Sequence, residues 1–169
     1  MPQSHAGPVD PRIRDVTRAD VDAVVGLIQE LALYEKLPEE CHVTAELLHA
    51  ALFAAQPAVY AQVGVIDGEV AGFALWFLNF STWEGVHGIY LEDLYVRPRY
   101  RGSGLGKALL LNLAAIAVQR GYARVEWSVL DWNTPSIDFY RSLGAVPMDG
   151  WTAFRLTGPA LVRRGTGTA

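Results

Sequence analysis

The sequence feature that most limits the fold is a glycine-rich loop between an apolar, strand-like segment and a long helix-like segment. The loop reads Arg101-Gly102-Ser103-Gly104-Leu105-Gly106-Lys107. Its three alternating glycines leave backbone N–H groups uncovered beside a helix N-terminus, where the positive end of the helix dipole lies. Such a cradle favours an anionic phosphate group. The spacing differs from a Walker P-loop, because Lys107 is followed by Ala108, and from the G-x-G-x-x-G dinucleotide motif, whose third glycine falls at Lys107.

Apolar periodicity predicts the elements around this loop. Thr17 and Asp20 resemble a capping box that opens a helix, and Thr44 resembles the cap of a second helix. Asp67-Gly68 is typical of a tight hairpin turn. The predicted strands are 13–16, 59–66, 70–80, 89–96, 125–129 and 153–156, and the predicted helices are 18–34, 45–56, 105–120 and 135–143, with Gly121 and Thr134 as caps. The order β-α-α-β-β-β-α-β-α-β predicts an α/β fold, a mixed sheet with helices on both faces.

Length and composition narrow the class of protein. The 169 residues, 51% of them hydrophobic, suit one domain, expected at 12–162 between a loose arm at 1–11 and a frayed tail at 163–169. A formal net charge of −4 disfavours nucleic acid as a partner. A single cysteine, Cys41, suits the reducing cytoplasm. We expect no membrane helix, because the longest apolar run, 72–80, is too short, and no secretory signal.

With this topology, the loop resembles the R-x-x-G-x-G/A pyrophosphate loop of the GNAT superfamily of N-acetyltransferases, and the resemblance extends over about 13–156. The segments 31–35, 90–96, 132–140 and 150–151 are similar to the diamine (spermidine/spermine) acetyltransferase subfamily. The resemblance implies acetyl-CoA as co-substrate, and a strand whose backbone pairs with the pantetheine arm and polarises the thioester carbonyl. The implied coenzyme-binding residues are Leu94, Tyr95, Val96, Arg101, Gly102, Ser103, Gly104, Leu105, Gly106, Lys107, Asn133 and Ser136.

Two acidic residues, Glu92 and Asp93, interrupt an otherwise apolar strand, where an unpaired carboxylate costs several kcal/mol. Strand alternation predicts Glu92 on the face of Leu94 and Val96, with Asp93 on the other. By resemblance, Glu92 binds the amine and accepts its proton, directly or through water; a structural salt bridge is the alternative. Asp93 is either structural or functional.

Tyr140 matches the tyrosine that serves as general acid toward the coenzyme sulfur in the family. The alternative is a packed aromatic residue on an amphipathic helix. Asn133 and Ser136 resemble coenzyme contacts, and equally a turn residue and a local cap. The implied reaction is direct attack by a primary amine in a ternary complex, without a covalent enzyme intermediate.

The resemblance also implies a small cationic acceptor: a short diamine, a polyamine or a lysine-like diamino acid. The implied acceptor-binding residues are Tyr34, Glu35, Glu92, Glu126, Trp127, Ser128 and Asp149, with Trp83 and Trp151 at the pocket edge. Two departures reduce the number of carboxylates expected for a polyamine: Thr82 precedes Trp83, and only Asp149 precedes Gly150-Trp151. We therefore predict a short diamine or lysine-like acceptor at least as good as spermine, unless Glu84 compensates.

Other classes of function receive less support. The histidines His5, His42, His49 and His87 form no metal motif, so no metal is expected, and no G-x-S-x-G elbow is present. A protein or peptide amine acetyltransferase and a non-catalytic acyl-CoA-binding sensor remain alternatives, because one fold hosts many acceptors. By resemblance to diamine acetyltransferases, which pair through their sheets, we expect a homodimer.

Overall fold

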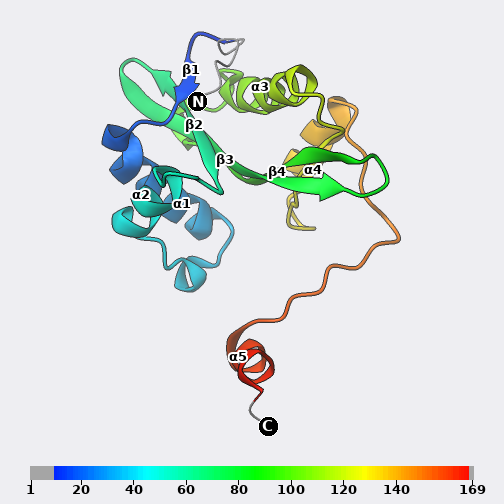
Figure 1. The fold of residues 1–169 in the computed structure, drawn as a ribbon. Coiled ribbons are helices and arrows are strands. Elements are labelled where there is room, and N and C mark those ends of the chain that lie inside the picture. The colour runs from blue at the N-terminus through cyan, green and yellow to red at the C-terminus, as the bar shows by residue number, and fades with distance from the viewer. Residues whose placement is uncertain (1–9, 168–169) are drawn as a thin grey trace. The chain divides into compact units, whose positions relative to one another are not determined.

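The computed structural model describes residues 10–167, so most of the arm expected at 1–11, and residues 168–169, lie outside it (Figure 1). Its sheet has the order β1-β2-β3-β4-β5, with antiparallel pairing from β1 to β4 and a parallel β5. The strands are Ile13–Asp15, Tyr60–Ile66, Glu69–Ser81, Val86–Val96 and Val125–Glu126. The predicted mixed α/β sheet is confirmed, although β5 is shorter than the predicted strand at 125–129.

Helices cover both faces of the sheet, as predicted (Figure 1). Helices α1 (Val21–Tyr34) and α2 (Ala45–Leu52) pack on one face, in a core that includes Leu27, Phe73 and Tyr95. Helix α3 (Leu105–Gln119) covers the other face, where the Asn112 amide on α3 donates to Gln62 on β2. Three short 3-10 helices are Arg18–Asp20, Pro38–Glu40 and Pro98–Tyr100. The two layers of apolar contacts fix β4 and the N-terminus of α3 in place.

Local sequence signals set several element ends. The Thr44 hydroxyl accepts a hydrogen bond from the Leu47 N–H at 3.2 Å, as expected of an N-cap. The Thr17 N–H donates to the Asp20 carboxylate at 2.7 Å, which closes the capping box, although it opens the 3-10 helix that precedes α1. Asp67 and Gly68 both have positive φ, 51° and 79°, and this suits the two-residue turn between β2 and β3.

A β-bulge interrupts β4 at Glu92. Asp93 lies opposite Leu75 on β3, whereas Leu91 lies opposite Trp76, so β4 has one residue more than β3 at this point. Asp93 thus shares the α1 and α2 face with Leu75, while exposed Glu92 is the extra residue. The simple alternation that grouped Glu92 with Leu94 and Val96 fails here, because a bulge resets the period of two.

The contacts divide the chain into two compact units, and the second begins at Asp131. It contains α4 (Thr134–Ser142) and α5 (Gly158–Thr166). A single domain at 12–162 therefore stays a prediction. The cap of α4 is Asn133 and not the predicted Thr134, because the Asn133 side-chain oxygen accepts from the Ser136 N–H.

The strand predicted at 153–156 is absent from the sheet described for residues 10–167. Its alternation has no neighbouring strand in the structure, and Phe154 is 95% exposed. Residues 163–166, expected in a frayed tail, form the last part of α5 instead. A Pro at the start of α5 and Gly167 in the left-handed conformation at its end explain the helix boundaries.

Candidate active site

The glycine-rich loop adopts a backbone conformation that leaves it open above the start of α3. Gly102 and Gly104 have φ of 81° and 78°, in the left-handed region where glycine is favoured. A Cβ atom at either position would meet no atom within 4 Å, so open space lies above the loop. Gly104 is the N-cap of α3, and the first N–H groups of a helix have no intrahelical partner. The loop therefore fits a pyrophosphate group.

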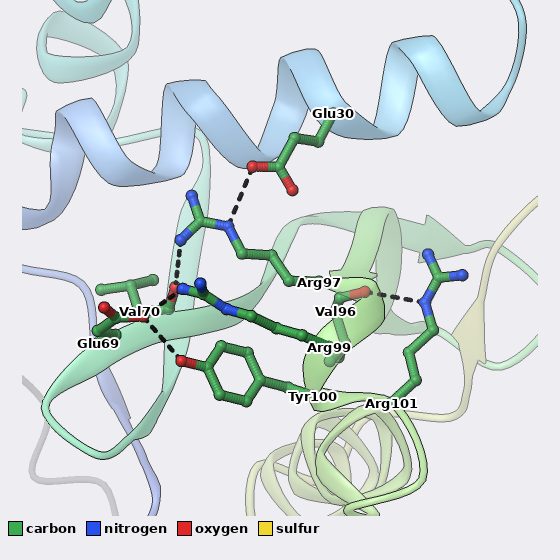
Figure 2. A network of polar contacts seen from close by, with 8 residues as sticks. All are labelled: Glu30, Glu69, Val70, Val96, Arg97, Arg99, Tyr100 and Arg101. Atoms are coloured by element: carbon green, nitrogen blue, oxygen red, sulfur yellow. Dashed lines mark hydrogen bonds and ion pairs between the residues drawn. The ribbon is translucent and has the colours of Figure 1, made fainter.

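Side chains hold both ends of this loop. The Arg12 guanidinium donates to the Ser103 carbonyl at 2.9 Å, and Arg12 is itself paired with Asp10 at 2.7 Å. Hydrogen bonding to Arg12 lowers the pKa of the Asp10 carboxyl. At the other end, Arg101 Nε donates to the Val96 carbonyl at 3.1 Å (Figure 2). These contacts tie the loop to Arg12, the residue before β1, and to Val96 at the end of β4.

Strand β4 has an open edge next to the loop. Its parallel pairing with β5 consists of Ile89 with Val125 and Tyr90 with Glu126. After Tyr90, β4 and β5 no longer pair in the described chain. The edge of β4 that faces β5 is therefore without a hydrogen-bonded neighbouring strand at residues 91–96. An extended chain carrying amide groups, such as a pantetheine arm, can pair with such an edge. Leu94, Tyr95 and Val96 all lie on this stretch.

Three carboxylates gather on the α1 side of β4: Glu35, Glu92 and Asp93. Burial raises the pKa of Asp93 to about 6, and the negative charges of Glu92 and Glu35 contribute in the same direction. Burial also raises the pKa of Glu35, which is the C-cap of α1. None of the three forms an ion pair within the described part of the chain. Glu35 and Asp93 are half-buried and Glu92 is exposed, and a group of carboxylates without a cation favours binding of a cationic ligand.

Three further predicted residues, Glu126, Trp127 and Ser128, lie at the end of β5 and directly after it. The Glu126 carboxylate accepts from the Asn79 amide at 2.7 Å and pairs with Arg124 at 3.0 Å. The Ser128 hydroxyl lies 2.8 Å from the Tyr90 hydroxyl. Glu126 thus differs from the carboxylate group on β4, because it already has a cationic partner.

The second unit contains four of the predicted site residues: Asn133, Ser136, Tyr140 and Asp149. Asn133 is buried at the start of α4, and the ring of Tyr140 lies 5.4 Å from that of Phe139. Asp149 is exposed, and so is Trp151, at 72%. Within the first unit the structure brings together Tyr34, Glu35, Glu92 and the loop that begins at Arg101.

Sequence reasoning did not detect two features of this site. The first is the bulge at Glu92, and the second is the burial of Asp93 beside two other acids. The available signal is the adjacent pair of acids in an apolar strand. A bulge places two residues opposite one on the partner strand, and this leaves Glu92 exposed without a cross-strand partner while Asp93 is half-buried.

Comparison with known proteins agrees with the predicted family and fold. Residues 27–145 match the pattern of the Acetyltransferase (GNAT) family. The chain is 38% identical over 160 residues to "Thialysine N-epsilon-acetyltransferase" of Bos taurus, covering 88% of this chain and 94% of that relative. It is 46% identical over 95 residues to the "L-ornithine N5-acetyltransferase" of Arabidopsis thaliana, covering 56% of this chain and 42% of that relative. An integron cassette protein from the mobile metagenome of V. cholerae has a similar structure, with a TM-score of 0.76, 26% identity and coverage of 90% and 96%.

The open glycine-rich loop at the start of α3 follows β4, whose edge beyond Tyr90 is not paired with β5. The chain belongs to the GNAT acetyltransferase family, and it is an N-acetyltransferase. Members of this family use acetyl-CoA as co-substrate. No helix among residues 10–167 has the length and apolarity to cross a bilayer, and no cluster of metal-ligating side chains occurs in that range.

Proposed function

We propose that this enzyme acetylates the side-chain amine of a lysine-like diamino acid or a short diamine. The observation that carries the proposal is the group formed by Glu35, Glu92 and Asp93, three carboxylates without an ion-pair partner in the described chain. Relatives named for thialysine and ornithine acetylation support an acceptor of this size and charge.

Acetyl-CoA supplies the acetyl thioester when it is bound. The backbone N–H groups of residues 102–107 hold its pyrophosphate, and the backbone of Leu94, Tyr95 and Val96 pairs with its pantetheine arm. The open space above Gly102 and Gly104 and the unpaired edge of β4 support these assignments. Coenzyme contacts by Asn133 and Ser136 rest on the family resemblance alone, since Asn133 already caps α4.

Glu92 accepts a proton from the acceptor amine, directly or through water, so that the amine attacks as a neutral nucleophile. Its exposed position on the bulge supports this role. Tyr140 supplies a proton to the departing thiolate, because a phenol carries its proton at neutral pH. Cys41 lies at the end of a short 3-10 helix and takes no part in the reaction.

The number of available carboxylates limits how many cationic centres the acceptor brings. A charge-assisted hydrogen bond contributes about 1.5–3 kcal/mol, so each carboxylate lost from the acceptor site weakens the binding of a long polyamine. Thr82 carries no charge, and Glu126 is neutralised by Arg124. A short diamine or a lysine-like diamino acid is therefore expected to be at least as good an acceptor as spermine.

The deciding experiment measures kcat/KM for thialysine, a short diamine, spermine and a lysine-containing peptide under one condition, with thiol release as the signal. We expect thialysine or the diamine to equal or exceed spermine. A tenfold or greater preference for spermine contradicts the acceptor proposal. Activity on the peptide alone favours a protein acetyltransferase, and coenzyme binding without turnover on any amine favours an acyl-CoA sensor.

The coenzyme site has its own test, because Gly104→Val places a branched side chain in the open space above the loop. Calorimetry should show loss of acetyl-CoA binding. Gly85→Val is the matched control, since Gly85 also has positive φ, 70°, and open space around a Cβ, but lies in the turn between β3 and β4. Equal acetyl-CoA affinity for the two variants contradicts the assignment.

The general acid is tested with Tyr140→Phe, which keeps the ring and removes the hydroxyl. A positioned acid contributes about 10²–10⁴-fold, so kcat should fall by that order while acetyl-CoA affinity stays the same. Tyr122→Phe is the control for loss of a phenol elsewhere. An unchanged kcat returns Tyr140 to the role of a packed aromatic residue.

We also propose that the enzyme is a cytoplasmic homodimer. The single cysteine favours a reducing compartment. Large apolar side chains stay exposed after α4, including Val146, Trp151 and Phe154, and exposed apolar surface of this kind supports a protein interface. Light scattering at micromolar concentration that gives the mass of one chain contradicts the dimer.

A further inference from the structure

Arg101, the first residue of the glycine-rich loop, has unusual neighbours for an arginine in a phosphate-binding motif. Its guanidinium carbon lies 5.2 Å from the ring centre of Tyr34 and 5.5 Å from that of Tyr95. Both distances are within the range of cation–π attraction. Nε of the same guanidinium donates to the Val96 carbonyl (Figure 2), so the group contacts the backbone of β4 as well as the two rings.

The other arginines of this segment have different partners. Arg97 Nε donates to Glu30 on α1 at 3.0 Å, and Arg99 pairs with Glu69 on β3 (Figure 2). Their charges are thus neutralised by carboxylates. Arg101 makes no ion pair within residues 10–167, and its guanidinium carbon lies over the rings of Tyr34 and Tyr95 instead. Arg101 is therefore the arginine of this segment that joins the loop to the last residue of α1.

The C-terminal end of α1 connects the ring that contacts Arg101 to one of the acceptor carboxylates, Glu35. Tyr34 is the last residue of the helix, and Glu35 is its C-cap. The Leu37 N–H donates to the Ala32 carbonyl at 2.9 Å, and the Lys36 N–H donates to the Leu33 carbonyl at 3.1 Å. This pair of bonds closes the helix end and fixes Tyr34 relative to Glu35. A displacement of Arg101 should therefore displace the Tyr34 ring, and the closed helix end should pass this movement on to Glu35.

We propose that Arg101 is a positioning residue that couples the binding of coenzyme and acceptor, an inference that rests on the proposed function. A coenzyme pyrophosphate on the loop fixes residue 101, the guanidinium fixes Tyr34, and Tyr34 fixes the acceptor carboxylate Glu35. The coupling is reciprocal, because an acceptor that fixes Glu35 must strengthen coenzyme binding by the same factor.

The test measures the Kd of coenzyme A by calorimetry, with and without saturating thialysine. In the wild-type enzyme we expect thialysine to tighten coenzyme A binding by about fivefold or more, within the usual range of coupling between sites. Arg101→Lys keeps the charge but not the planar group that lies on the rings. It should lose the coupling, so that thialysine no longer tightens coenzyme A binding, and it should raise the KM for thialysine more than it lowers kcat.

Tyr34→Leu should lose the same coupling, and the double variant should lose no more than either single variant, because the two residues act through one contact. Arg99→Gln is the matched control, since Arg99 belongs to the same segment but pairs with Glu69, and its coupling factor should equal that of the wild type. Thermal melting of each variant separates misfolding from loss of coupling.

Two results overturn the inference. One is a wild-type enzyme in which thialysine leaves the Kd of coenzyme A unchanged. The other is an Arg101→Lys variant that keeps the full coupling factor, or that weakens coenzyme A binding equally with and without thialysine, which makes Arg101 a phosphate ligand only. Failure of the proposed function is distinguishable, because it appears as absence of acetyl transfer to thialysine in the wild-type enzyme.

Discussion

Two groups of carboxylates lie near β4 and differ in their partners. Glu30 and Glu69 pair with Arg97 and Arg99, and these pairs join α1 and the start of β3 to the segment that follows β4 (Figure 2). Glu35, Glu92 and Asp93 have no such partner within the described chain, and the pKa of Asp93 is raised by burial and by the other two charges. Glu30 and Glu35 come from one helix and its cap, so position along the sequence does not separate the groups. The two groups differ in whether an arginine is paired with the carboxylate. The paired acids stabilise the fold, and the unpaired acids are available to a cationic ligand.

The strongest way to break this comparison is Glu92→Gln. The variant loses the proton acceptor and keeps the size of the side chain, so kcat/KM near neutral pH should fall by about 10²–10⁴-fold. Activity should recover partly at high pH, where the amine arrives already deprotonated. The pH–rate profile with thialysine measures both effects. A profile identical to that of the wild type makes Glu92 a structural residue, and Glu69→Gln, an acid from the paired group, serves as the control.

Asp93→Asn tests the cost of an unpaired, half-buried acid. The raised pKa means that the folded state binds a proton more tightly than the unfolded state, so wild-type stability decreases as the pH rises from about 4 through about 6. Above that range the neutral amide should increase the free energy of unfolding by an amount on the order of 2 kcal/mol, and below pH 4 it should add nothing. Urea unfolding at pH 4 and pH 8 measures the difference.

The same variant should raise the KM for a cationic acceptor, because it removes one of the three negative charges. A gain in stability together with a weaker acceptor affinity is the expected pattern for an acid kept for function. If Asp93→Asn instead destabilises the protein at pH 8 and leaves the KM unchanged, Asp93 belongs with the paired, structural acids.

The opposite pattern is expected for Glu30→Gln. Its partner Arg97 is half-buried, with a side chain 25% exposed, and loss of the ion pair should lower the free energy of unfolding by about 0.5–1 kcal/mol. Acetyl transfer to thialysine should be unchanged at 25 °C. Thermal unfolding and steady-state kinetics on the same preparation check both parts. A large loss of activity without a loss of stability contradicts the division into two groups.

The smallest effect is expected at Lys36, which follows the unpaired acid Glu35 and has a φ of 63°. A residue with a Cβ is strained in this conformation at a helix end, so Lys36→Gly should raise the free energy of unfolding by about 0.5–1 kcal/mol. Lys36→Ala is the matched control, because it removes the charge and keeps the strain. A gain in stability for the alanine variant attributes the effect to charge and contradicts this account.

Features that depend on a few neighbouring residues were predictable from the sequence. Thr44 at the start of α2, the Asp67-Gly68 turn and Gly121 after α3 each act through their own backbone or through residues three or four positions away. The glycine-rich loop belongs to the same class, because the conformation of Gly102 and Gly104 is set locally and the loop lies between two predictable elements.

Features that depend on distant partners were not predictable in the same way. The alternation at 153–156 is that of a strand, yet a strand also needs a neighbour, which no sequence pattern within the segment supplies. The Glu126 carboxylate accepts from the Asn79 amide, 47 residues away, and no local pattern indicates this partner. The contact of Arg101 with Tyr34 likewise spans two elements that are far apart in the chain.

The bulge in β4 determines whether a residue could be deleted there without loss of pairing between β4 and β3. Every residue of β4 except Glu92 has a cross-strand partner on β3. Deleting Glu92 would leave Leu91 opposite Trp76 and Asp93 opposite Leu75, so the ladder would close into a regular one with all its present pairs. Strand pairing with β3 therefore does not require a residue at this position, and a carboxylate there is free to contact a ligand without loss of any pair in the sheet.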